Sequence, residues 1–164
     1  MSTRHTILAT PIGDLTVVRD DEGVTGVYFP HHWTRPDRAA FGPRVAAGFE
    51  DVAAQLADYF AGERTEFDLP LHRTGSPQQQ RVWRLIDAIP YGRTATYGEL
   101  ARALGDGTTA QEVGAAVGAN PLSILVGCHR VVGADGRLTG YAGGLERKRR
   151  LLDLESGQRR LEAS

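Results

Sequence analysis

The only cysteine of this 164-residue chain, Cys128, stands directly before His129 and Arg130 in the stretch "ILVGCHRVVG". Cysteine attacks as the thiolate, and an ordinary thiol pKa of about 8.5 leaves only a few per cent ionised at neutral pH unless a base or a positive charge assists. His129 is the nearest base, and a carboxylate further on, Asp153 or Glu155, is available to orient its ring. Neighbours in an extended chain point in opposite directions, so we expect His129 to reach the sulfur through a water molecule or a local bend.

A packing role for the same thiol competes with this chemistry, because free cysteine is among the most buried residue types. With one cysteine the chain forms no internal disulfide and no cysteine-rich zinc site. His31, His32 and His72 also have no cysteine partners, so we expect no metal site. The residues alone leave the nucleophilic and the packing role of Cys128 open.

The elements that must position the thiol divide at about residue 73. Before it, short apolar runs separated by turn residues predict an antiparallel meander with strands over 6–9, 15–19 and 24–29. The polar stretch "HHWTRPDRAAFGPR" reads as a loop, and apolar residues at helical spacing in "FEDVAAQLADYFAGE" predict a helix that packs on the sheet. Pro70, Gly75 and Pro77 mark a short linker.

The second half has a mainly helical pattern. Helices are predicted in "SPQQQRVWRLIDAIP", "TYGELARALGDG", "TTAQEVGAAVGANP" and "LERKRRLLDLE", with Thr108 or Thr109 as the N-cap of the third. "LSILVGCH" reads as a buried strand or extended segment, and a Gly-Asp-Gly turn between two short helices suggests a helix-turn-helix. We therefore predict an α+β fold with a structural N-terminal α/β domain, 1–73, and a helical C-terminal domain, 74–164, that carries the cysteine.

Composition and charge limit the class of protein. A hydrophobic content of 41% is ordinary for a globular chain. No run approaches the roughly 18 apolar residues of a membrane helix and the N-terminus lacks a signal peptide, so we expect a cytoplasmic protein. Residues 1–73 hold 7 basic and 11 acidic side chains, a net of −4, whereas residues 74–164 hold 12 and 9, a net of +3. This excess is compatible with a polyanion partner, although the "RKRR" run, 147–150, itself reads as a solvated helix face.

The motifs around the cysteine together resemble the O6-alkylguanine-DNA alkyltransferase family. Cys-His-Arg-Val follows an apolar stretch, is preceded by "TYGELA" and "VGAAVGANP", and is followed by "LTGYAGG" and "RKRRLLDLE". The resemblance covers residues 76–155 in register, and the N-terminal strands and helix fit that family's smaller α/β domain. It implies a monomer that binds duplex DNA through the minor groove. The alkyl group on O6 of a damaged guanine would move to a protein cysteine in one irreversible turnover, without a cofactor.

The resemblance also implies roles for individual residues. Cys128 matches the alkyl acceptor, His129 the water-linked base and Glu155 the carboxylate that orients it. Tyr97 matches a phenol that donates a proton toward the guanine ring, and Asn120 an asparagine that joins the recognition helix to the active-site segment. From the residues alone, Tyr97 would be a half-buried helix aromatic and Asn120 a helix-ending turn.

Other residues match the base pocket and the DNA-binding surface. The loop that walls the pocket corresponds to Tyr141, Gly140, Gly143 and Gly144. A base inside a duplex must leave the stack to reach a thiol, so the small-residue-rich helix 110–118 is expected in the minor groove. The residues expected at DNA are Thr96, Thr109, Ala110, Gln111, Ala115 and Ala116. Close helix packing is the alternative for the two later alanines, and Arg130 is expected to brace the segment through an internal ion pair.

The sequence departs from the family's pattern at three places. Gly127 stands where proline usually precedes the cysteine, and Gln78 stands where an aromatic residue is common. Gln111, followed by Glu112, stands where the recognition helix carries an intercalating arginine. The thiol residues are thus intact, whereas the DNA-handling residues are altered.

These departures keep two alternative functions open beside DNA repair. One is a protein that recognises alkylated DNA and signals it without efficient transfer. The other is a specialised transferase for bulky adducts or for a small-molecule donor. The intact set of Cys128, His129 and Glu155 favours chemistry over binding alone.

Overall fold

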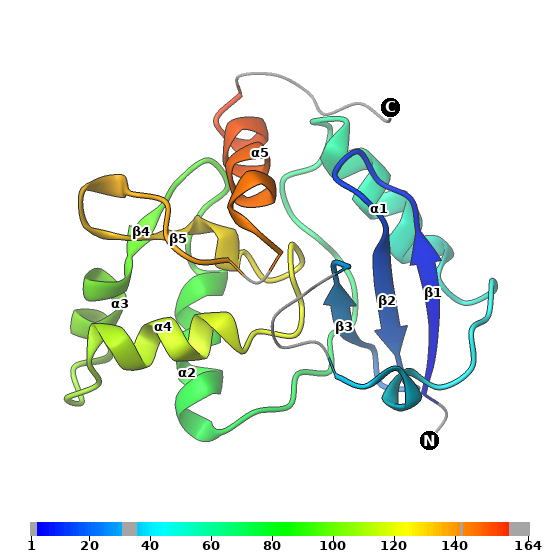
Figure 1. Ribbon diagram of the computed structural model, residues 1–164, viewed down its shortest axis with the longest axis horizontal. Helices are drawn as coiled ribbons and strands as arrows, with labels where there is room; N and C mark the ends of the chain where they lie inside the picture. The colour runs from blue at the N-terminus through cyan, green and yellow to red at the C-terminus, as the bar shows by residue number, and fades with distance from the viewer. Residues whose placement is uncertain (1–2, 31–35, 142, 158–164) are drawn as a thin grey trace.

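The computed structural model describes residues 3–30, 36–141 and 143–157, and it has the predicted α+β fold (Figure 1). The N-terminal sheet is antiparallel in the order β1 (Arg4–Leu8), β2 (Leu15–Arg19), β3 (Val24–Tyr28). α1 (Glu50–Phe60) lies beside this sheet, and its buried side chains belong to the same apolar core. The predicted meander and its helix are confirmed. The predicted loop before α1 lies partly outside the described residues and contains a short 3-10 helix, η1 (Arg38–Phe41).

The second half contains the predicted helices, which are α2 (Pro77–Asp87), α3 (Tyr97–Leu104), α4 (Ala110–Gly118) and α5 (Leu145–Glu155). Two short strands, β4 (Ala95–Thr96) and β5 (Val131–Val132), pair in parallel, and at two residues each they are too short to give a periodic signal. Short 3-10 helices follow at η2 (Cys128–Arg130) and η3 (Ala134–Gly136). None of the helices in the described ranges has the length and apolarity that a membrane span requires.

Capping boxes start three of these helices. In each, a hydroxyl accepts the N–H of the third helical residue, whose own side chain accepts the N–H of the cap. The pairs are Ser76 with Gln79, Thr96 with Glu99, and Thr109 with Glu112. Thr109 is therefore the N-cap of α4, and capping accounts for both threonines that were expected at DNA.

α2 packs across α4 and fixes the direction of the latter. Trp83 is 1% exposed and donates from Nε1 to the Ala116 carbonyl at 2.9 Å. Ala116 itself is 3% exposed and its methyl group lies in the core, which favours the alternative of close helix packing at this residue. Ala115, one residue earlier, is exposed.

The segment that leads to the cysteine is not a strand. Ile124 has a φ of 72°, and Val126 N donates to the Leu122 carbonyl at 2.8 Å, which folds the chain back on itself. Leu122 also forms an isolated bridge with Val27 of β3. The apolar side chains of this segment reflect burial, whereas its backbone bonds are mostly local, and periodicity cannot distinguish these two cases.

Gly127 makes the last bend before the thiol. Its φ of −74° and ψ of 52°, with Cys128 N donating to the Val126 carbonyl at 2.7 Å, form an inverse γ-turn. η2 begins at the next residue, so Cys128 and His129 do not alternate across a strand. The chain therefore bends locally at the thiol.

The "RKRR" run on α5 is only partly solvated. Arg147 Nε donates to the Ile12 carbonyl at 2.7 Å, and its guanidinium carbon lies 5.0 Å from the centre of the Phe29 ring. Lys148 is 1% exposed, whereas Arg149 is exposed. The interpretation of the run as a solvated face is wrong for its first two residues, because their long aliphatic stems pack inward and their charged ends reach backbone carbonyls.

We predict that Gly127→Pro exceeds Gly127→Ala in free energy of unfolding by about 0.4–1 kcal/mol, because only proline restricts the unfolded chain. The φ of −74° suits the proline ring, and Gly127 N donates no hydrogen bond within the described ranges. Both variants add a Cβ at 3.0 Å from Arg130 Cδ, so this contact cancels in the comparison. Urea denaturation measures the difference. A proline variant that is less stable than the alanine variant would show that Val126 does not fit the extended conformation required before proline.

Candidate active site

Cys128 is buried at the start of η2, with 4% of its surface exposed. Burial raises the pKa of its thiol, whereas Asn120, Lys148 and Tyr141 favour the thiolate and offset only part of this effect. The thiol is therefore protonated at neutral pH. It needs a base before it can act as a nucleophile.

His129 follows in the same turn and is fully buried, and its Nε2 lies 2.7 Å from Oε2 of Glu155 on α5. Of the two carboxylates considered from the sequence, Glu155 makes this bond. Because an ionised carboxylate only accepts, Nε2 carries the hydrogen, and the neutral ring has its lone pair on Nδ1. Nδ1 is buried and has no hydrogen-bond partner within the described ranges. The residue next to the thiol thus holds an unused basic nitrogen.

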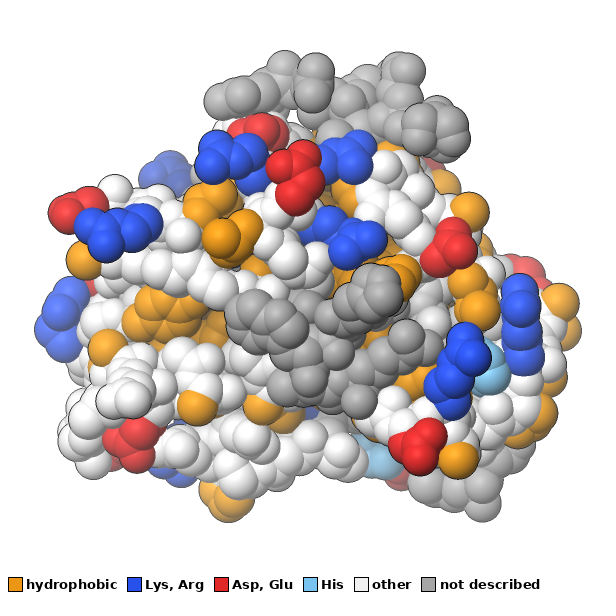
Figure 2. Space-filling model, in the orientation of Figure 1, with side chains coloured by type: hydrophobic (Ala, Val, Ile, Leu, Met, Phe, Trp, Pro, Cys, Tyr) orange, Lys and Arg blue, Asp and Glu red, His pale blue; other side chains and the backbone are white. Residues whose placement is uncertain are grey.

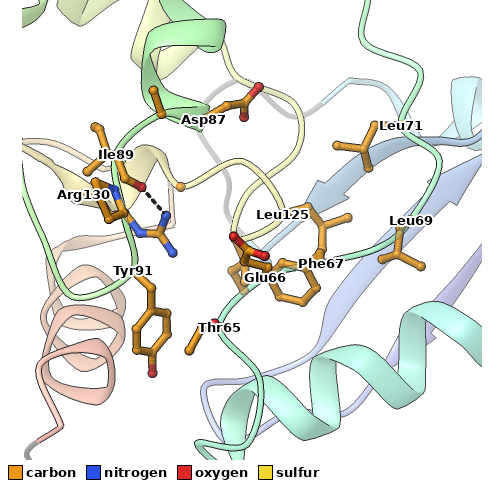
Figure 3. Close-up of a pocket in the computed structure, with 14 residues that line it drawn as sticks. Thr65, Glu66, Phe67, Leu69, Leu71, Asp87, Ile89, Tyr91, Leu125 and Arg130 are labelled. Atoms are coloured by element: carbon orange, nitrogen blue, oxygen red, sulfur yellow. Dashed lines mark hydrogen bonds between the residues drawn. The ribbon is translucent and has the colours of Figure 1, made fainter.

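Glu155 accepts further hydrogen bonds from Tyr59 of α1 and from Arg130 of η2. The Tyr59 hydroxyl of α1 donates to Oε2 at 2.5 Å, and Arg130 donates from Nε to Oε1 at 2.7 Å and from Nη2 to Oε2 at 3.0 Å. Burial alone would raise the pKa of Glu155, but His129 and Arg130 outweigh it and hold that pKa well below its usual range. Arg130 is also anchored to the backbone, since its Nη1 donates to the Ile89 carbonyl at 2.9 Å (Figure 3).

Asn120 connects α4 to the segment that carries the cysteine, residues 122–131, called here the thiol segment. It is 1% exposed, its Oδ1 accepts from Leu122 N at 3.0 Å, and its Nδ2 donates to the Val126 carbonyl at 3.4 Å. These bonds hold both ends of the turn that precedes Gly127. Asn120 therefore does more than end a helix.

Gly127 and Arg130 also line a pocket of about 520 Å³ between the two halves of the chain (Figure 3). Its other walls include Phe67, which precedes the linker, and Tyr91. Cys128 is not among the lining residues, so this pocket is not the entrance to the thiol.

A second hollow, of about 450 Å³, lies along α4 (Figure 2). This α4 groove is lined by Tyr97, Ala110, Gln111, Gly114, Val117, Gly118, Thr139 and Gly140. Thr139 Oγ1 donates to the Tyr97 hydroxyl at 2.9 Å, which joins the loop to the start of α3. Residues expected for proton donation, DNA contact and base binding thus line one hollow.

The other loop residues expected at the base pocket do not line the α4 groove. Tyr141 is 3% exposed and packs edge-on against Phe29, with ring centres 5.9 Å apart. A Cβ on Gly143 would lie 2.3 Å from Phe29 Cδ2, so this glycine is required by core packing. Gly144 has a φ of 96°, which glycine adopts without strain at the start of α5.

The start of α4 presents Ala110 and Gln111 to solvent, and Gln111 lines the groove. The carboxylate of Glu112 turns back, because it accepts from Thr109 N at 2.9 Å. This backbone bond, together with the Thr109 hydroxyl, lowers the pKa of Glu112. The negative charge beside Gln111 is therefore part of the helix cap.

Outside the thiol site, His72 pairs with carboxylates. Its Nδ1 lies 2.8 Å from Oδ2 of Asp20 and 3.1 Å from Oε2 of Glu22. Asp20 already accepts the N–H groups of Glu22 and Gly23, so these contacts fasten the turn after β2 to the linker. His31 and His32, considered with His72 in the sequence, lie outside the described residues.

Sequence reasoning missed two residues of this site. Tyr59 lies 96 positions before Glu155, and its helical spacing in α1 fully explains it as a core residue. Lys148 is concealed within a charged run. A buried lysine gives no local signal that separates it from solvated neighbours.

We predict that Glu155→Gln lowers the free energy of unfolding at pH 7 by about 3–5 kcal/mol, because it leaves the buried charge of Arg130 without its partner. Asp153→Asn on the same helix is the matched control and should change it by less than about 0.5 kcal/mol. The folded pKa of Glu155 lies below its ordinary 4.5, so the contribution is present above that pH and is lost as the pH falls toward the folded pKa. The gap between wild type and Glu155→Gln should therefore narrow in acid. Urea denaturation at several pH values tests this, and a gap independent of pH would contradict it.

Two family models match the chain. Residues 3–72 match the 6-O-methylguanine DNA methyltransferase, ribonuclease-like domain, and residues 77–157 match the 6-O-methylguanine DNA methyltransferase, DNA binding domain. Together they cover most of the chain.

Relatives with known names and structures agree with these matches. The methylated-DNA–protein-cysteine methyltransferase of Mycolicibacterium paratuberculosis is 48% identical over 148 residues, covering 89% of this chain and 88% of the relative. The protein of the same name from Methanosarcina acetivorans is 39% identical, covering 92% and 97%. A crystal structure of Mycobacterium tuberculosis OGT in complex with DNA superposes with a TM-score of 0.87 at 42% identity, covering 96% of this chain and 95% of that one. The chain therefore belongs to the 6-O-methylguanine DNA methyltransferase family.

Proposed function

We propose that this chain repairs DNA by moving the alkyl group of O6-alkylguanine to Cys128 in a single, irreversible turnover. The observation that carries the proposal is the buried thiol in the same turn as a histidine whose Nε2 is bonded to an ionised carboxylate. The names of the relatives describe this transfer from methylated DNA to a protein cysteine. Recognition of alkylated DNA without transfer would leave these three residues without a role.

The first step is removal of the thiol proton. Nδ1 of His129 takes the proton of Cys128 through a bridging water molecule, and Glu155 stabilises the imidazolium that forms. Four hydrogen bonds hold that carboxylate, so little reorganisation accompanies the proton transfer.

The second step is the alkyl transfer. The thiolate forms a bond to the alkyl carbon, the carbon–O6 bond breaks, and its electron pair stays on the guanine. Tyr97 donates a proton to the guanine ring. The proton that His129 took from the thiol finally replaces the one that Tyr97 lost, so the products are S-alkylcysteine and neutral guanine. The thioether has no route back to a thiol in this site, which makes the turnover final.

Duplex DNA would bind, to a single copy of the protein, with the start of α4 in the minor groove. The base would swing out of the stack into the α4 groove, where Tyr97 and Gly140 lie. Gln111 would stand at the vacated position. A crystal structure of the Mycobacterium tuberculosis relative is itself a complex with DNA, which supports binding to DNA.

The test of the function uses the lone thiol. Wild-type protein incubated with duplex DNA containing O6-methylguanine should gain one methyl group per molecule, on Cys128, and then stop, as intact-protein and peptide mass spectrometry would show. Cys128→Ser should gain none while its unfolding temperature and DNA affinity stay close to wild type. Binding without transfer would indicate a signalling protein, transfer only from a free alkylated base would indicate a small-molecule donor, and repeated turnover would rule out the mechanism.

We further predict that Gln111→Arg raises the single-turnover rate on duplex DNA but not on free O6-methylguanine. Arginine fills the vacated base position and adds a charge near the phosphates, whereas glutamine is shorter and neutral. Extruding a base costs a few kcal/mol, and a free base avoids this cost.

The control for added charge is Ala115→Arg, on an exposed position of the same helix. All rates are compared at one salt concentration, because phosphate contacts are salt-dependent. Equal gains in both variants would show a general charge effect. An unchanged ratio of duplex rate to free-base rate in Gln111→Arg would show that Gln111 does not stand at the vacated position.

A further inference from the structure

Lys148 is a buried cation on the side of α5 that faces the thiol site. It is 1% exposed, and its Nζ donates to the Val131 carbonyl at 2.7 Å and to the Thr139 carbonyl at 3.1 Å. Within the described ranges no carboxylate forms an ion pair with it. Burying an ammonium group without an anion is costly, and this cost points to a functional role for Lys148.

The two carbonyls belong to segments on either side of the reaction. Val131 begins β5 directly after η2, which carries Cys128. Thr139 belongs to the loop that closes the α4 groove, and its hydroxyl donates to the Tyr97 hydroxyl at 2.9 Å. One ammonium group thus connects the thiol segment to the phenol proposed as proton donor.

The charge of Lys148 also acts on the thiol. Burial lowers the pKa of Lys148 to about 8, and the thiolate of Cys128 opposes that shift. Lys148 in turn is one of the groups that favour the thiolate. Tyr141 faces the thiol from the loop, and Arg147 and Glu155 of α5 act on that tyrosine. The thiolate that forms when Cys128 loses its proton would compensate the buried positive charge of Lys148.

We propose that Lys148 is a positioning residue for alkyl transfer: its charge favours the thiolate of Cys128, and its two hydrogen bonds hold Thr139, and through it Tyr97, against the thiol segment. The proposal rests on the proposed function for its second half. Its first half concerns the thiol alone and can be tested without alkylated DNA.

The experiment follows the rate at which iodoacetamide modifies Cys128 as a function of pH. Because the chain has one cysteine, the mass of the intact protein reports this thiol alone. Lys148→Met removes charge and hydrogen bonds, and Lys148→Gln removes the charge but keeps a donor. At pH 7, where Lys148 carries its charge, both variants should be modified about tenfold more slowly than wild type or slower still, whereas Lys148→Arg should stay near wild type. The difference should narrow above about pH 8, where Lys148 itself loses its proton. Arg149→Met, which removes a charge from an exposed position of α5, is the matched control and should be modified at the wild-type rate.

Single-turnover rates on free O6-methylguanine complete the test. Lys148→Met should be at least about tenfold slower than wild type, and Lys148→Gln should lie between them because it keeps part of the connection to Thr139. Thermal unfolding shows which variants are folded, and the glutamine variant serves if the methionine variant is not. A wild-type modification rate at pH 7 in a folded Met or Gln variant would overturn the proposal. Absence of transfer by the wild type, with the slower modification of the variants present, would overturn the proposed function and leave the charge effect standing.

Discussion

The carboxylate of Glu155 is the interaction on which the rest of the site depends. It accepts hydrogen bonds from Tyr59 of α1 and from His129 and Arg130 of η2, while its own backbone ends α5. A buried carboxylate with so many donors stays ionised, and its charge determines which nitrogen of His129 is free. The group that orients the base therefore also joins the N-terminal helix to the last helix. Chemistry and tertiary structure share one pair of oxygen atoms.

Local signals were enough for most of the fold. Hydroxyl residues at the caps, apolar spacing and glycine stops predicted the meander, α1 and the four helices of the second half, because these elements satisfy their backbone hydrogen bonds internally or with a neighbouring strand. The path from Leu122 to Gly127 could not be predicted, since Asn120 supplies its key hydrogen bonds through a side chain. The contacts of Tyr59 and Lys148 could not be predicted either. Tyr59 contacts Glu155, which is remote in the sequence, and Lys148 is itself hidden in a charged run.

The surroundings of Cys128 and the surface of α4 differ in burial, and therefore in how much a substitution costs in stability. On the thiol side, buried charges are paired or held by carbonyls, which favours a fixed geometry. On the α4 side, the exposed Gln111 carries one of the three differences from the family's pattern, and the capping box restrains the charge of Glu112 there. A departure at an exposed position costs little stability, so DNA contacts can change at Gln111 while Cys128, His129 and Glu155 are kept.

The bridges from β3 to the rest of the chain have a consequence for the integrity of the protein. β3 is an outer strand of its sheet, and its free side is covered by Leu71 of the linker and by Leu122 of the thiol segment. An uncovered outer strand presents unpaired N–H and C=O groups on which another chain can add a strand. Separating the two halves would thus expose an aggregation-prone edge on one piece and strip the support from the cysteine on the other. The repair site and the solubility of the sheet are protected by the same few backbone bonds.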